Sequence, residues 1–289
     1  MVEKVNTIEG LDRKLQELDL AEKISDDALR AAFQTFTMDY PPDIPADPTS
    51  QQYRDYVFSL YSKISGRTYE IKNESSNFDI SNAVSRPFPF YTGSPRTVGD
   101  QLIMIGNLIK LLSVPAGGSI LEFGPGWGTT TLFLAQMGYD VTALDIDPNF
   151  ADLIVARGKA IGVPIDSRVG DFFMIETLDK QFDAIVFFEC FHHCSDHERL
   201  FRGFDKRVKP GGRILFGAEP ISSDFPVPWG LRLDGESLWA IRNFGWLELG
   251  YQETYFVDAL RRHGWECEKQ NSRDIPWISY FVAKRIGEA

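Results

Sequence analysis

The stretch ILEFGPGWGTTTLFLAQMGYDVTALDIDP, residues 120–148, decides the fold. It predicts a buried strand, a glycine-rich loop, a helix and a second buried strand that ends in acidic residues. Gly124, Gly126 and Gly128 let the backbone approach a ligand that a Cβ would hold away. Asp145 stands at the end of the second strand, where a carboxylate can accept hydrogen bonds from ribose hydroxyls. The stretch therefore predicts a site for a nucleoside with a free ribose diol.

The spacing of the glycines discriminates between two classes of ligand. A dinucleotide fingerprint, G-x-G-x-x-G, needs a third glycine where this chain has Thr129. Glu122 precedes the loop, where its charge would repel a pyrophosphate but suits the cationic methionine end of S-adenosylmethionine. The loop therefore favours a sulfonium nucleoside. The alternative is that the glycines only allow a strand to pack against a helix.

From residue 118 onward, predicted strands alternate with predicted helices. Apolar runs such as DAIVFF, residues 183–188, indicate burial on both faces, which is typical of a parallel sheet with helices on either side. The sequence KPGG, residues 209–212, ends a helix before the fifth strand. We expect an α/β fold with a late helix at 251–263 and with strands at 119–123, 140–145, 166–169, 182–188, 213–218, 265–270 and 277–284.

The residues before this domain have a different pattern. Residues 1–94 are predicted to form a helical region or lid, with one helix capped by Ser25 and stopped by the prolines at 41–42. A second helix is expected to end at Gly66. The proline-punctuated segment 82–95 is expected to be an extended connection.

The second predicted domain covers residues 95–289. It begins with an amphipathic helix at 97–114, and an aromatic-rich insertion at 221–250 interrupts it after the fifth strand. Neither an internal repeat nor a low-complexity tract is present.

Composition limits the class of protein. The chain has 289 residues and a formal net charge of −11, which argues against a nucleic-acid partner, since such affinity comes largely from basic groups. No apolar run reaches the ~20 residues that a membrane span needs. Three cysteines form no disulfide framework and indicate a reducing compartment. We expect a soluble cytoplasmic protein without a membrane span, which could form a homo-oligomer.

Five segments in order resemble the motifs of the class I S-adenosylmethionine-dependent methyltransferases: LEFGPGWG, VTALDIDP, VGDFF, FDAIVFFECFHHCSD and RVKPGGRILF. The resemblance covers roughly residues 95–289 and implies a Rossmann-like, seven-stranded sheet whose last strand is antiparallel and inserted. It implies that Asp145 binds the ribose, that Asp171 lies at the adenine amine and that Phe172 lies against the ring. The implied cofactor site comprises Glu122, Phe123, Gly124, Pro125, Gly126, Gly128, Asp145, Ile146, Asp171, Phe172 and Glu189.

The ECFHHCSD loop, residues 189–196, concentrates reactive side chains near the expected methyl group. His193 is the preferred general base and His192 the second candidate, because a neutral imidazole can take the proton of an attacking hydroxyl. The alternative is that both histidines only shape the loop, because methyl transfer depends chiefly on in-line alignment. Zinc is disfavoured, since the remaining candidate ligands, Cys267, His197 and His263, form no paired motif, and we predict no metal.

The sequence defines the methyl acceptor less closely than it defines the cofactor. Aromatic residues of the insertion and the helix after it could line an acceptor pocket, or form the core of a lid or interface: Phe225, Trp229, Trp239, Phe244, Trp246, Tyr251 and Tyr255. Tyr91 and Arg96 are further candidates for the edge of the site. General resemblance to bacterial methyltransferases of sugars, glycans or natural products implies O-methylation of a small or glycan-like acceptor. The alternatives are N- or C-methylation of a lipid or protein, a non-catalytic cofactor-binding subunit, and, least favoured, a nicotinamide oxidoreductase.

Overall fold

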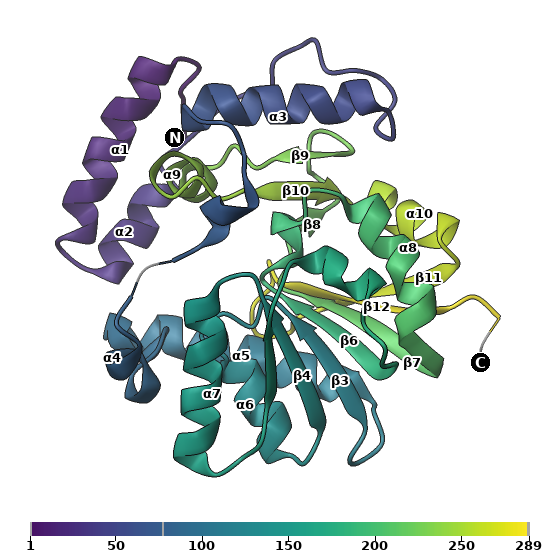
Figure 1. Ribbon diagram of the computed structural model, residues 1–289. Helices are drawn as coiled ribbons and strands as arrows, with labels where there is room; N and C mark the ends of the chain where they lie inside the picture. The colour runs from purple at the N-terminus through teal and green to yellow at the C-terminus, as the bar shows by residue number, and fades with distance from the viewer. Residues whose placement is uncertain (1, 77, 288–289) are drawn as a thin grey trace.

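A seven-stranded sheet forms the centre of the computed structural model, which describes residues 2–76 and 78–287 (Figure 1). The strand order is β11-β12-β7-β6-β3-β4-β5, and all neighbours are parallel except at β12, which lies antiparallel between β7 and β11. The predicted α/β class and the inserted antiparallel last strand are therefore confirmed. The strands are β3 (Ser119–Phe123), β4 (Asp140–Asp145), β5 (Asp166–Val169), β6 (Phe182–Phe188), β7 (Val208–Gly217), β11 (Trp265–Asn271) and β12 (Ser279–Arg285).

Helices cover both faces of this sheet because its central strands are apolar on both sides. Ile120 of β3 packs in the cluster that includes Leu108 of a helix on one face, whereas its neighbour Leu121 packs in the cluster that includes Phe201 on the other. The helices beside the sheet are α5 (Pro95–Leu112), α6 (Thr129–Gln136), α7 (Pro148–Ile161), α8 (His197–Arg207) and α10 (Glu253–Arg262). Within the described residues, none of the helices combines the length and apolarity that a bilayer crossing requires.

The N-terminal helices and the insertion pack together beyond the carboxyl ends of the strands, and we call this assembly the cap (Figure 1). The buried Tyr53 hydroxyl donates to the Trp229 carbonyl at 2.6 Å, and the Tyr61 hydroxyl donates to the Gly245 carbonyl at 2.5 Å. The cap consists of β1 (Glu3–Lys4), α1 (Ile8–Glu22), α2 (Asp26–Phe33), β2 (Phe36–Thr37), α3 (Gln51–Ser65), β8 (Ile221–Ser222), β9 (Trp229–Leu231), α9 (Gly235–Asn243) and β10 (Leu249–Gln252).

Two N-terminal expectations need correction. Ser25 caps α2 as expected, but the helix ends at Phe33, well before the prolines, because the next residues pair as β2 with β1. The segment expected to be extended contains most of α4 (Ile80–Ser85), which Asp79 caps, and a short 3₁₀ helix, η2 (Phe90–Thr92). Local capping there outweighs the proline signal.

Two expectations about the second half also differ in detail. Strand β7 begins at Val208 rather than 213, because Val208 already pairs with Phe182 of β6 and the KPGG residues form an irregularity before regular pairing resumes at Arg213. The predicted late helix starts at Glu253, since the residues before it form β10 of the cap.

Candidate functional site

A cavity of about 830 Å³ lies between the carboxyl ends of β3, β4 and β6 and the cap. This is where the strand order reverses, because the chain runs outward from β3 to β5 and then returns to β6 on the other side. The loops after the strands line one side of the cavity, and α2 and α9 line another. The expected position for a ligand of such a sheet is therefore hollow.

The glycine-rich loop between β3 and α6 turns only because two positions lack a side chain. A Cβ at Gly124 would lie 2.5 Å from the Cβ of Cys190, and one at Gly128 would lie 2.7 Å from Cγ1 of Ile154. Both glycines have positive φ, +54° and +73°. Gly124 and Gly126 line the cavity, whereas Pro125 and Gly128 shape the loop behind it.

Asp145 lies on the cavity wall at the end of β4 and also fixes the glycine loop. Its carboxylate accepts one hydrogen bond from the Gly126 amide at 3.0 Å and another from the Asp147 amide at 2.9 Å. Burial raises the pKa of Asp145 to about 6, against the hydrogen bonds that lower it. The carboxylate is thus oriented by the backbone toward the ligand position.

The structure places Glu122 differently from the sequence-based expectation. Its side chain is 1% exposed, it does not line the cavity, and it accepts a hydrogen bond from the Thr131 hydroxyl at 2.6 Å. Burial raises the pKa of Glu122 to about 7. The correction is that Glu122 touches α6 instead of the cavity, because its strand position points the side chain under the loop.

Other expected cofactor residues come together on the cavity wall. The rings of Phe123 and Phe172 have centroids 5.6 Å apart, and Ile146 and Asp171 line the cavity beside them. Asp171 also caps the 3₁₀ helix η3 (Phe172–Glu176) through the Phe173 amide, at 2.9 Å. An apolar slot with one carboxylate at its edge suits a flat heterocycle bearing an amine.

Glu189, at the end of β6, has its carboxylate in the cavity. It adopts a positive φ of 52°, which is strained for a residue other than glycine, and it accepts a hydrogen bond from the Gln101 amide at 3.0 Å. Desolvation by the cavity wall and the nearby Glu219 and Glu236 charges raise the pKa of Glu189 to about 7, despite the Gln101 hydrogen bond and the solvent exposure of the side chain. A cation beside Glu189 would favour its ionised form.

A segment from the N-terminal region reaches across to the cofactor side, which the sequence did not indicate. The Ser76 amide donates to Asp147 at 2.5 Å, and Asn149 donates to the Ser76 carbonyl at 3.0 Å. Phe78 packs on Trp127 of the glycine loop with ring centroids 4.8 Å apart. The segment is polar and lacks periodicity, so no local signal identifies it.

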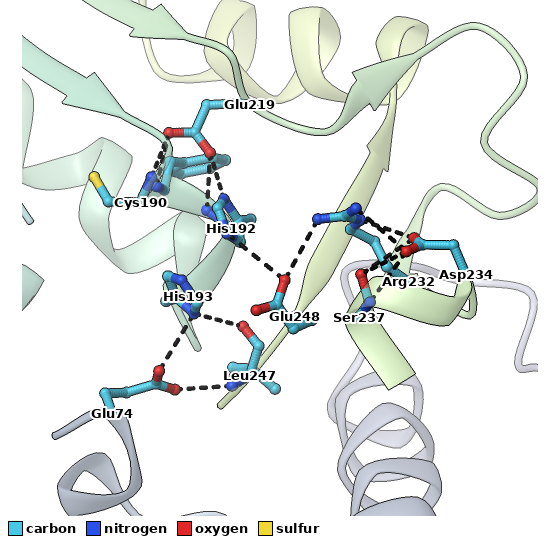
Figure 2. Close-up of polar contacts among 11 residues, drawn as sticks. Glu74, Cys190, His192, His193, Glu219, Arg232, Asp234, Ser237, Leu247 and Glu248 are labelled. Atoms are coloured by element: carbon cyan, nitrogen blue, oxygen red, sulfur yellow. Dashed lines mark hydrogen bonds and ion pairs between the residues drawn. The ribbon is translucent and has the colours of Figure 1, made fainter. Parts of the chain in front are cut away.

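His193 lies on the cavity wall with one ring nitrogen already engaged (Figure 2). Its Nδ1 lies 3.0 Å from the Leu247 carbonyl and 3.3 Å from Oε2 of Glu74, whose other oxygen accepts from the Leu247 amide at 2.9 Å. A carbonyl can only accept, so Nδ1 carries a proton and Nε2 is the nitrogen left for chemistry. Burial lowers the pKa of His193, but the Glu74 carboxylate outweighs it and raises the pKa to about 9.

His192 points away from the cavity into a buried polar network (Figure 2). Its Nδ1 lies 2.8 Å from Glu219, which also accepts hydrogen bonds from the backbone amides of Cys190 and Phe191 at 2.9 Å each. Burial holds the pKa of His192 well below its usual value, which keeps the ring neutral. This geometry fits a residue that fixes the shape of the loop, and it separates His192 from the cavity that His193 lines.

The polar network around His192 also contains the residues that come closest to forming a metal site. In the described part of the chain, His192, His193 and Glu248 place ligand atoms within 4.8 Å of one another. Arg232 already lies 3.4 Å from Oε2 of Glu248, however, and its positive charge opposes a cation there. Cys190 and Cys194 are buried free thiols outside this group.

The aromatic residues of the insertion divide between two roles. Trp239, Phe244 and Trp246 line the cavity, whereas Trp229 and Tyr251 are buried in the core of the cap. Tyr255 is also buried, and the Phe225 ring meets that of Tyr40. Some of these aromatic residues therefore line the cavity, as one expectation had it, and others form the core of the cap, as the other had it. Of the two edge candidates, Tyr91 lines the cavity, while Arg96 is 77% exposed.

The chain is similar to known methyltransferases. Residues 121–216 match the family model of a methyltransferase domain. The chain is 24% identical to phosphoethanolamine N-methyltransferase 3 of Arabidopsis thaliana, over 62% of the chain and 41% of that protein. It is 31% identical to a ubiquinone biosynthesis O-methyltransferase of Xanthomonas axonopodis pv. citri, over 35% of the chain and 43% of that protein. The chain spans about half the length of the curated relatives it matches.

Solved structures show the same fold. Mitomycin 7-O-methyltransferase MmcR is 17% identical, with a TM-score of 0.51 over 84% of this chain and 74% of that protein. DhpI, in a complex described as DhpI-SAM-HEP, is 20% identical, with a TM-score of 0.50 over 71% of this chain and 92% of that protein. At these identities the likeness concerns the fold alone.

Proposed function

We propose that this chain, which contains a methyltransferase domain of the class I, S-adenosylmethionine-dependent type, methylates a hydroxyl of a small or glycan-like acceptor. The observation that carries the proposal is a single cavity in which the expected cofactor residues and the free Nε2 of His193 meet. Bound S-adenosylmethionine supplies a methyl group on a positively charged sulfur. The three cysteines of the protein are free thiols, which fits the reducing cytoplasm that we propose as the compartment of this protein.

The residues of the cavity fit such a cofactor. In this proposal, Asp145 accepts hydrogen bonds from the ribose diol, and Phe172 and Asp171 hold the adenine ring and its amine. The bare backbone at Gly124 and Gly126 leaves room for the chain between ribose and sulfur. Glu189 lies on the same wall and would face the ammonium of the methionine end. Glu122 contributes charge from beneath the loop without contact.

His193 is the proposed general base. Its Nδ1 proton is held by Leu247 and Glu74, so Nε2 can accept the proton of the acceptor hydroxyl as the oxygen attacks the methyl carbon. The resulting imidazolium is stabilised by the Glu74 carboxylate, and the proton later leaves to solvent. With a pKa of about 9, His193 is protonated near neutral pH, and a cationic cofactor in the same cavity favours its neutral form.

Two measurements test the proposal. Calorimetry should detect binding of S-adenosylmethionine and of S-adenosylhomocysteine, and incubation with methyl-labelled cofactor and a fractionated bacterial extract should label a small or glycan-like molecule. With that acceptor, His193→Gln should lower turnover at saturating cofactor by about 10²-fold or more, the usual contribution of a general base. His263→Gln, which removes a histidine paired with Glu198 outside the cavity, is the matched control. Absence of cofactor binding would refute the function, and an unchanged rate for His193→Gln would refute the base.

A further inference from the structure

The ionisable side chains on the cavity wall are predominantly acidic. Two of them can be cationic, Arg30 and His193, whereas seven are carboxylates: Glu22, Asp26, Glu74, Asp145, Asp171, Glu189 and Glu236. A cavity with such an excess of one charge attracts ligands of the opposite charge and repels anions. The charge of the lining therefore carries information about the acceptor as well as the cofactor.

Five of these carboxylates already have partners or proposed roles. Asp26 binds Arg30 at 2.9 Å and also accepts from the Thr97 hydroxyl at 2.7 Å. Glu74 pairs with His193 at 3.3 Å. Asp145 and Asp171 have roles in the proposed cofactor site, and so does a fifth carboxylate, Glu189. The two carboxylates that remain, Glu22 and Glu236, both lie on the side of the cap.

Glu236 stands out among the two because of its surroundings. Among the described residues, none donates a hydrogen bond to the Glu236 carboxylate. The cap of α9 is made by Asp234 instead, which accepts a hydrogen bond from the Ser237 amide. Desolvation by the cavity wall raises the pKa of Glu236, although the Arg232 and Arg30 charges lower it, and the side chain remains exposed to solvent. Its carboxylate is therefore free to accept a hydrogen bond from a ligand that enters the cavity.

Aromatic rings line the same cavity as Glu236, on α9, on α2 and in the chain after α9. Trp239 follows Glu236 by three residues on α9, so the two side chains share a helix face. The Phe33 ring of α2 lies 5.5 Å from the Trp239 ring, and the Phe244 ring lies 4.9 Å from it on another side. Trp246 continues this wall toward His193, with ring centroids 6.2 Å apart. Aromatic faces next to a carboxylate form the environment that proteins use for ammonium groups.

We propose that the acceptor carries a protonated amine, which Glu236 and the aromatic wall of Phe33, Trp239 and Phe244 hold, while a hydroxyl of the same molecule reaches His193. The proposal rests on the proposed function and narrows its acceptor to an amine-bearing polyol or ring, such as an amino sugar. The distance between the two ends is bridged by Trp246, which contacts both Phe244 and His193. The ammonium anchors the acceptor and is not itself methylated.

Arg30 does not reverse this preference. Its Nε is bound to Asp26 within the same helix, and the Glu236 and Glu189 carboxylates lie close enough to interact with its charge. An acidic acceptor would have to compete with these carboxylates for a single guanidinium. A cationic acceptor meets at least one carboxylate without a hydrogen bond.

The test compares the charge of otherwise matched ligands. Wild-type protein saturated with S-adenosylhomocysteine is titrated with each ligand, and binding is followed by ligand-observed NMR. The sugar series is D-glucosamine, D-glucose, N-acetyl-D-glucosamine and D-glucuronate. Two further series contain the amine, neutral and carboxylate forms of a linear polyol and of a phenol. We expect the amine form of each scaffold that binds to be the tightest, by about tenfold, the usual value of a charge-assisted hydrogen bond. Equal or tighter binding by neutral or acidic forms, or no binding by any amine form, overturns the proposal.

Two variants locate the anchor. Glu236→Gln keeps the shape of the side chain and should reduce the preference for the amine form to about twofold or less, with cofactor affinity unchanged. Glu266→Gln, on β11 away from the cavity, is the control and should keep the full preference. An unchanged preference in Glu236→Gln overturns the assignment of the anchor. Failure to bind S-adenosylhomocysteine would instead count against the proposed function, and the ligand series would then be measured on the protein alone.

Discussion

The ion pair between Glu74 and His193 makes the pH dependence of the reaction predictable. Glu74 is 9% exposed and His193 23% exposed, so solvent screens their interaction weakly. With a pKa of about 9, roughly 1% of His193 is neutral at pH 7 in the free protein. The value of kcat/KM for the cofactor, which reports on the free protein, should therefore rise about tenfold per pH unit up to pH 9 and then level off.

Replacing Glu74 by Gln should move this profile to lower pH. Gln retains an oxygen for the Leu247 amide but removes the charge beside Nδ1, and burial then lowers the pKa of His193 to its ordinary 6.5 or below. The ascending limb should shift from near pH 9 to below pH 7. The plateau should fall by about tenfold, because the base is weaker and the imidazolium has lost its partner. The two profiles should therefore cross: Glu74→Gln should be the faster protein at low pH, because far more of its His193 is neutral, and the slower one above about pH 8.

The assay is methyl transfer from labelled cofactor to the identified acceptor between pH 5.5 and 10. Glu70→Gln, a surface carboxylate of the same segment that pairs with Lys72, is the control and should keep the wild-type profile. Because the pKa of His193 is raised in the folded state, the ion pair stabilises the fold fully below pH 6.5, and this contribution is lost as the pH rises through 9. The Tm difference between wild type and Glu74→Gln should shrink accordingly. An ascending limb at the same pH in both proteins would refute the reasoning.

Three further outcomes follow from the contacts described above. Asp145→Ala should weaken S-adenosylhomocysteine binding about 10- to 100-fold by calorimetry, because charge-assisted hydrogen bonds to the ribose and to the loop are lost together; unchanged affinity would contradict the role of Asp145. Tyr53→Phe should lower the free energy of unfolding in urea by about 1–2 kcal/mol, since the buried Trp229 carbonyl loses its donor. The pKa of His193, followed by NMR, should be lower with S-adenosylmethionine than with S-adenosylhomocysteine, because only the former carries the sulfonium charge; equal values would argue against a shared cavity.

Local sequence patterns predicted the sheet well because its central strands, such as β3 and β6, are apolar and turn residues bound them. The position of Asp145 followed from the same logic, since the carboxyl end of a parallel strand is fixed once the strand is identified. The extent of β7 was missed because its first residues, with two glycines and a proline, have the composition of a turn. Its pairing with β6 depends on a partner strand that local composition does not describe.

The parts of the site that escaped prediction depend on contacts between distant segments. Glu74 and His193 are more than a hundred residues apart, and the polar segment around Glu74 carries no periodic signal. The cap likewise forms through hydrogen bonds such as that from Tyr53 to Trp229, across 176 residues of sequence. Glu122 was misplaced for another reason. Spacing located it next to the glycine loop, but only the packing of α6 shows that its carboxylate turns to Thr131.

The excess of carboxylates also bears on how the reaction could turn over. Burial raises the pKa of Asp145 to about 6 and that of Glu189 to about 7, so both groups hold protons more readily in the empty cavity than in water. A cationic donor favours their ionised forms, and its binding should release protons near neutral pH. Transfer of the methyl group leaves a neutral sulfur, and the carboxylates then lose that attraction. The same acidic wall therefore holds the donor more tightly than the product, which keeps its ammonium but has lost the sulfonium charge.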